Sequence, residues 1–153
     1  MQITRFTDLG LRVLMYLSMG ARDAAGRATI TELAERLAVS RNHLVKVVHR
    51  LAQLELVATT RGKGGGMALA RPADQYRLGD VVRALEDNPS LIDCGAPPCV
   101  LARNCQLKSA LDDALQAFFE RLNRCTLADA VRAPTGLSIV SLQRRGAVLP
   151  VTV

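Results

Sequence analysis

The chain of 153 residues has a globular composition, with 49% hydrophobic and 22% charged residues, and is long enough for one compact domain with an appended helix or tail. It contains neither an apolar stretch long enough to span a membrane nor a signal-peptide pattern, which predicts a cytoplasmic protein. The formal net charge is +6, and residues 1–71 carry all of this excess, with 11 Lys and Arg against 5 Asp and Glu. A basic half suits a polyanion such as DNA, although an ordinary solvated surface could have the same charge.

The first third of the chain predicts three helices. Apolar residues at helical spacing indicate a first helix from a cap at Thr7 to about residue 21, and a second helix begins at Thr29 or Thr31. After a short break, Ser40 is a suitable N-cap for a third helix over about residues 41–54. The inward face of this third helix is aliphatic at i, i+3, i+4, i+7 spacing and consists of Leu44, Val47, Val48 and Leu51.

The opposite face of the third helix is polar and basic. Two short helices joined by a tight turn, the second of them basic, are typical of a helix-turn-helix. The free N–H groups at the start of the third helix suit a phosphate, and side chains one and two turns further along can reach base edges in the major groove. The predicted DNA-binding residues of this helix are Ser40, Arg41, Asn42, His43, Lys46, His49 and Arg50.

Two short extended runs follow, over residues 57–61 and 67–70, with four glycines and a lysine between them. This pattern predicts a β-hairpin with a flexible, cationic tip, which would add a wing to the helix-turn-helix. Arg61 and Lys63 on the wing can reach the adjacent DNA backbone or the minor groove. A winged helix can also be a protein-interaction module, but charge, capping and element order together favour DNA binding.

The second half of the chain predicts a short helix over residues 78–86 and a long one over residues 106–124 with a wide apolar stripe. A loop that holds three cysteines lies between these helices. Residues 133–153 show no sustained periodicity and are predicted to be a poorly ordered tail. We find no cluster of acid–base residues that would indicate an enzyme.

Cys94, Cys99 and Cys105 form the pattern C-x4-C-x5-C around Pro97-Pro98. Zinc sites prefer closer cysteine pairs or histidines, and the only two histidines lie on the predicted DNA-binding helix, so the spacing favours an iron–sulfur cluster. A thiol redox switch and plain free thiols are the alternatives. Cys125 lies 20 residues beyond Cys105, or about 30 Å along a helix, so it is not expected to share a cluster with Cys105 of the same chain.

These features resemble the winged-helix iron–sulfur repressors of the IscR/NsrR type. The resemblance extends over about residues 1–132. The x4/x5 cysteine spacing, with no histidine shortly after Cys105, is most similar to the nitric-oxide-sensitive NsrR branch. The matching segments are residues 1–8, 10–14, 40–48, 60–66, the cysteine loop, 117–119 and 126–129.

The resemblance implies a homodimer joined largely through the long C-terminal helices and bound to an inverted-repeat operator in double-stranded DNA. It implies repression of nitric-oxide-detoxification genes until nitric oxide attacks the cluster. A 4Fe–4S cluster is favoured over 2Fe–2S, and the resemblance suggests Asp8 of the other subunit as a fourth ligand beside the three cysteines. An equally good interpretation of Asp8 is that it stabilises the first turn of its helix. The alternative function is an iron–sulfur or thiol-based redox regulator of the same family, which responds to cluster supply or oxidants.

The predicted fold is therefore mainly α: a winged helix-turn-helix with a Gly-rich β-hairpin wing and a long C-terminal dimerisation helix. We expect four parts along the chain. They are a DNA-binding domain over residues 1–87, a cluster-binding loop over 88–105, the dimerisation helix with its following segment over 106–132, and the tail over 133–153.

Overall fold

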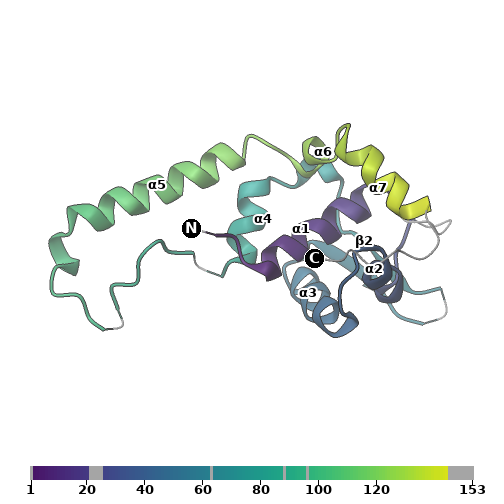
Figure 1. Ribbon diagram of the computed structural model, residues 1–153, viewed down its shortest axis with the longest axis horizontal. Coiled ribbons are helices and arrows are strands. Elements are labelled where there is room, and N and C mark those ends of the chain that lie inside the picture. The colour runs from purple at the N-terminus through teal and green to yellow at the C-terminus, as the bar shows by residue number, and fades with distance from the viewer. Residues whose placement is uncertain (1, 21–25, 63, 88, 96, 145–153) are drawn as a thin grey trace.

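The structure is a computed structural model that describes residues 2–20, 26–62, 64–87, 89–95 and 97–144. In Figure 1 the long helix α5 (Gln106–Leu122) extends away from one packed body. The remaining helices and a small β-hairpin form this body. The segment between α4 (Leu78–Leu85) and α5 leaves this body and reaches the far end of α5. Among the described residues, no helix is both long enough and apolar enough to cross a membrane.

Helix α1 (Arg5–Ser18) forms the centre of the body, and its Val13, Leu14 and Tyr16 are almost completely buried. Thr4 caps this helix by accepting a hydrogen bond from the Thr7 backbone N–H at 3.2 Å, so the prediction that Thr7 is the cap was wrong. A tertiary contact fixes where α1 begins, because the Thr4 N–H and hydroxyl both donate to the carboxylate of Glu86, at the C-terminal end of α4. Thr7 is instead buried in the core.

Helices α2 (Ile30–Arg36) and α3 (Arg41–Gln53) form the predicted helix-turn-helix. The Ser40 hydroxyl accepts from the His43 backbone N–H at 3.3 Å, which confirms the predicted N-cap of α3. The four aliphatic residues of the inward face of α3 are each at most 5% exposed, as their spacing predicted. Between the helices, Ala38 adopts φ 53°, a left-handed conformation that reverses the chain within a few residues.

Strands β1 (Val57–Thr60) and β2 (Gly66–Leu69) pair antiparallel, with Thr60 opposite Gly66 at the turn. Ala28 extends this sheet by two backbone hydrogen bonds with Met67, of 2.9 and 2.8 Å. Gly65 is required in the wing turn, because a Cβ atom there would lie 2.5 Å from the Thr60 carbonyl oxygen. Lys63, the predicted cationic tip, lies outside the described residues.

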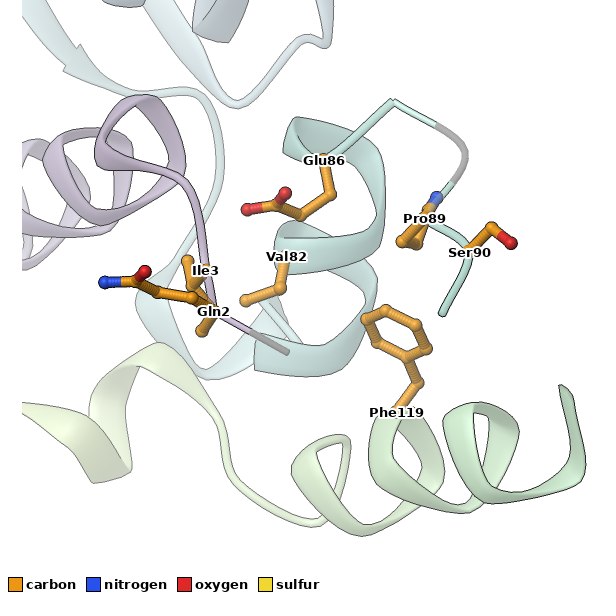
Figure 2. Close-up of a pocket in the computed structure, with 7 residues that line it drawn as sticks. All are labelled: Gln2, Ile3, Val82, Glu86, Pro89, Ser90 and Phe119. Carbon is orange, nitrogen blue, oxygen red and sulfur yellow. The ribbon is translucent and has the colours of Figure 1, made fainter. Parts of the chain in front are cut away.

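Helix α5 packs against α4 through its C-terminal half. A Cβ atom at Gly79 would lie 2.3 Å from the Phe119 carbonyl oxygen, so only glycine permits this close approach. Phe119 is 1% exposed and lies in one cluster with Val82 (Figure 2). The Arg83 guanidinium lies 4.3 Å above the Phe119 ring. Asn123 bonds to both the backbone N–H and the carboxylate of Asp80. These contacts anchor the end of α5, while its start extends away from the body.

The chain ends in α6 (Leu127–Ala130) and α7 (Thr135–Arg144). Helix α7 corrects the prediction of a poorly ordered tail for these residues; residues 145–153 lie outside the described part of the chain. Ile139 of α7 is buried against the core, and the Gln143 amide donates to the carbonyls of Tyr16 at 3.2 Å and Gly20 at 2.7 Å. A helix held by residues more than a hundred positions away has no local signature that periodicity can detect.

We expect Gln143→Ala to destabilise the protein by about 1–3 kcal/mol, because it removes the buried side chain that donates to the Tyr16 and Gly20 carbonyls at the end of α1. The matched control is Leu137→Ala on the same helix, where the side chain is 68% exposed. Urea unfolding should give a lower midpoint for the first variant than for the second. Equal midpoints would show that α7 does not support α1.

Candidate DNA-binding face and cysteine loop

The side chains predicted to read DNA form one exposed face of α3. Asn42, Lys46 and His49 are exposed at successive turns, opposite the buried aliphatic side of the helix. Arg41 and His43 are also exposed beside them, and the first turn of α3 carries no acidic residue. The positive end of the helix dipole, Arg41 and Lys46 therefore act together on any anion that approaches.

The wing and the start of α3 border the same concave surface. A groove of about 460 Å³ lies between them, with Arg41 on one side and the wing strands on the other. Arg61 is exposed at the end of β1. The charge pattern did not single out four exposed threonines that line this groove and offer hydroxyl donors to phosphate, namely Thr29, Thr31, Thr59 and Thr60.

Arg50 has a different environment from the other predicted DNA contacts. It is half-buried in the last turn of α3, where its guanidinium donates to the Ala84 carbonyl at 3.4 Å and lies 3.7 Å from the Asp87 carboxylate. Arg50 therefore joins the end of α3 to the end of α4. Its contact with DNA stays a prediction.

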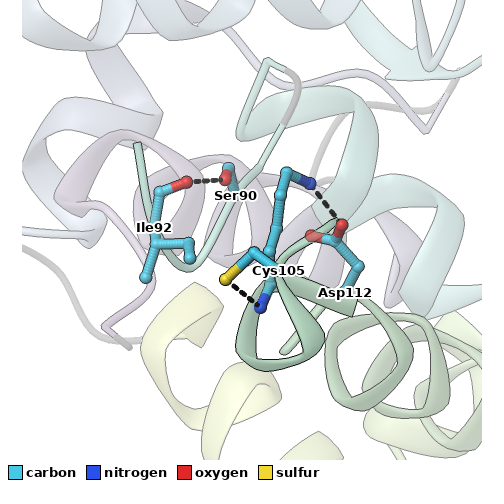
Figure 3. Close-up of polar contacts among 5 residues, drawn as sticks. Ser90, Ile92, Cys105 and Asp112 are labelled. Carbon is cyan, nitrogen blue, oxygen red and sulfur yellow. Dashed lines mark hydrogen bonds and ion pairs between the residues drawn. The ribbon is translucent and has the colours of Figure 1, made fainter. Parts of the chain in front are cut away.

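The three loop cysteines are free thiols. Cys94 and Cys105 are half-buried, whereas Cys99 is exposed. The Cys99 N–H donates to the Cys94 carbonyl at 3.1 Å and closes a turn of the loop. Cys105 is the N-cap of α5, and its sulfur accepts from the Lys108 backbone N–H at 3.4 Å (Figure 3). The Lys108 ammonium forms an ion pair with Asp112 one turn further along.

Desolvation raises the pKa of the Cys94 thiol, and the neighbouring Cys99 raises it further, while the Lys108 ammonium opposes both effects. The hydrogen bond that the Lys108 ammonium donates to the Asp112 carboxylate raises the pKa of Lys108, which therefore stays a cation beside the thiols. Three thiols on one loop, with Lys108 close to Cys94 and Cys105 and with Cys105 at a helix N-terminus, are a donor set that fits an iron–sulfur cluster. Within the described part of a single chain, however, no three Cys, His, Asp or Glu side chains are close enough to hold a metal ion. The loop would have to draw its thiols together around a cluster.

Asp8, the predicted fourth ligand, and Cys125, which was not expected to be a ligand, lie apart from the cysteine loop. Asp8 is exposed in the first turn of α1, where its carboxylate accepts from Arg12 Nε at 3.1 Å and pairs with Arg12 Nη2 at 2.9 Å. Its position in the first turn suits the positive end of the helix dipole. Cys125 lies between α5 and α6, and its carbonyl accepts from the Leu78 N–H at 3.0 Å.

A helix-turn-helix with an exposed basic second helix and a glycine-tipped wing beside it defines a winged-helix DNA-binding regulator. Residues 3–133 match the Rrf2 family of iron-dependent transcriptional regulators, and the chain belongs to this family. Members of the family are DNA-binding transcriptional regulators that form dimers, and they are not enzymes.

Solved structures share the fold. IscR of T. potens is 24% identical, with a TM-score of 0.66, and the match covers 86% of each chain. CymR, the global cysteine regulator of B. subtilis, is 24% identical with a TM-score of 0.63, over 85% of this chain and 95% of that one. The oxidised form of Staphylococcus aureus CymR is 22% identical with a TM-score of 0.63, over the same shares.

Proposed function

We propose that this protein is a transcriptional repressor that senses nitric oxide through an iron–sulfur cluster held by Cys94, Cys99 and Cys105, and that it controls nitric-oxide-detoxification genes. The observation that carries the proposal is the position of three free thiols on one loop, directly before α5 and directly after the winged domain. Membership of an iron-dependent regulator family and the structural likeness to an IscR support it.

Each part of the loop has a task in this proposal. Cys105 binds the cluster while its sulfur still accepts the Lys108 N–H, so that ligation and the start of α5 depend on the same side chain. The Lys108 ammonium lowers the pKa of Cys94, but desolvation and Cys99 outweigh it, so a cluster would have to displace the proton of this thiol. Asp8 of the partner subunit is the proposed fourth ligand of a 4Fe–4S cluster, for which it would loosen its contacts with Arg12. A bound cluster would supply iron to which nitric oxide can bind.

The apolar side of α5 is divided between two neighbours. Leu115 and Phe119 face α4 and are buried, whereas Leu107 and Phe118 are exposed. We propose that the exposed side of α5 pairs with the same side of a second copy to form a homodimer. Such a dimer presents two α3 helices to an inverted repeat with half-sites about 34 Å apart, so a shift of a few ångströms at the loop weakens DNA binding.

The alternative is a regulator that uses its thiols directly or responds to cluster supply. The exposed Cys99 and the free state of all three loop thiols favour it, because accessible thiols react with oxidants. This alternative predicts that oxidants change DNA binding equally well in cluster-free protein.

The deciding experiment measures DNA affinity for anaerobic cluster-loaded protein, cluster-free protein and nitric-oxide-treated protein. The DNA is an inverted-repeat operator selected from random sequences with the cluster-loaded form. We expect tight binding only for the cluster-loaded protein, with an affinity loss of about 100-fold, or about 2.7 kcal/mol, in the other two forms. Equal affinity of all three forms would remove the sensing function and leave the DNA-binding one.

A further inference from the structure

Helix α3 carries three valines, and the core accounts for only two of them. Val47 is 0% exposed and Val48 5%, whereas the Val45 side chain is 41% exposed. Helix propensity does not favour a valine at this position either, because a β-branched side chain loses rotamer freedom in a helix and lysine or glutamate stabilises an exposed helix position better. Neither the core nor the helix therefore explains why Val45 is a valine.

The neighbours of Val45 on the helix surface are all polar. Residues three and four positions apart on a helix lie side by side, with Cβ atoms about 5–6 Å apart. For Val45 these neighbours are Arg41, Asn42 and His49, which are exposed and belong to the predicted DNA-binding residues. Helix α3 lies at the edge of the packed body (Figure 1), so this face is open to a partner. A DNA molecule that contacts these three side chains also covers Val45.

The chemistry of the major groove limits what an apolar side chain can contact there. The base edges present hydrogen-bond donors and acceptors, together with one apolar group, the C5-methyl group of thymine. Valine neither donates nor accepts, so it would leave a polar base edge desolvated without a partner, which costs free energy. Against a thymine methyl group, by contrast, valine buries apolar surface on both sides.

We propose that Val45 recognises a thymine, through its C5-methyl group, at one fixed position in each half-site of the operator. The contact rests on the proposed entry of α3 into the major groove, but it does not depend on the kind of cluster or on its signal. It makes Val45 a specificity-determining residue that the charge pattern could not single out, because it carries no charge and no hydrogen-bonding group.

Replacing thymine by uracil tests the contact, because the two bases differ only in this methyl group. The full-length, anaerobically purified protein is measured against its selected operator, with each symmetric pair of thymines replaced by uracil in turn. At one pair we expect affinity to fall about fourfold for each lost methyl contact, or about 15-fold for both half-sites. In Val45→Ser the same replacement should change affinity less than about twofold, because the apolar partner of the methyl group is gone.

Leu137→Ser is the matched control, because it makes an exposed apolar side chain of α7 polar, outside the predicted DNA-binding residues. It should keep the full uracil effect. Both variants change exposed side chains, so the fold is preserved. Operators selected from random sequences with Val45→Ser should no longer contain a constant thymine at the sensitive position.

Two results would overturn the thymine contact: no uracil-sensitive position in the unmodified protein, or an equal uracil effect in Val45→Ser. The fate of the wider DNA-binding face is measured separately by Arg41→Ala and Lys46→Ala. If these two variants weaken binding while uracil has no effect, the thymine contact alone is wrong. If they also leave affinity unchanged, the proposed entry of α3 into the major groove is wrong as well.

Discussion

Alanine in place of Cys94, Cys99 or Cys105 is expected to abolish the binding of iron and acid-labile sulfide and to lower operator affinity by about 100-fold, to that of cluster-free protein. Each of the three thiols would be one point at which the cluster holds the loop. In the described part of the single chain, the loop does not bring its thiols close enough to hold a metal. Loss of one anchor therefore leaves the loop free. Iron and sulfide content, together with the visible spectrum of anaerobic protein, measure the result.

Cys125→Ala is the matched control, because it removes a thiol that lies beyond the C-terminal end of α5, whereas the three loop cysteines precede its start. It should keep both iron and sulfide. Asp8→Ala should keep iron but change the spectrum and lower the cluster's stability to oxygen, since the proposed fourth ligand comes from the partner. A cluster lost in Cys125→Ala and kept in Cys99→Ala would contradict the assignment of ligands.

Substitutions on the exposed face of α3 should have the second large effect. We expect Lys46→Ala to weaken operator binding by about 1–3 kcal/mol and to relax the preference for particular bases, because its exposed side chain would face the major groove when α3 enters it. Arg41→Ala should weaken binding to most sequences alike and reduce the dependence on salt, as expected for a phosphate contact. Fluorescence anisotropy with operator and unrelated DNA, at about 50 and 200 mM salt, measures both effects.

Arg132→Ala provides the control for these variants. Arg132 is a highly exposed cation that follows α6, paired with Asp129 at 2.9 Å, and lies outside the predicted DNA-binding residues. Its replacement should leave DNA affinity unchanged. An affinity that is independent of salt, or an equal loss in all three variants, would contradict the assignment of the α3 face.

The amino-acid sequence was sufficient for the elements whose signals are local. Ser40 and the aliphatic spacing of α3 specify a capped helix with one buried face, because a cap and a periodicity act within a few residues. The glycines of the wing specify its turn, because a side chain at Gly65 would collide with the backbone of the same hairpin. The cysteine spacing likewise placed three thiols on one loop before α5.

Only the tertiary structure decided the features that depend on distant partners. The hydrogen bond from the Thr4 N–H to Glu86 fixes Thr4 as the N-cap of α1. The hydrogen bonds from Gln143 to carbonyls at the end of α1 keep α7 in place. The apolar stripe of α5 did not reveal that Phe119 faces α4 while Phe118 remains exposed. Burial and long-range hydrogen bonds depend on which segments meet in space. Neither capping nor periodicity carries that information for a single segment.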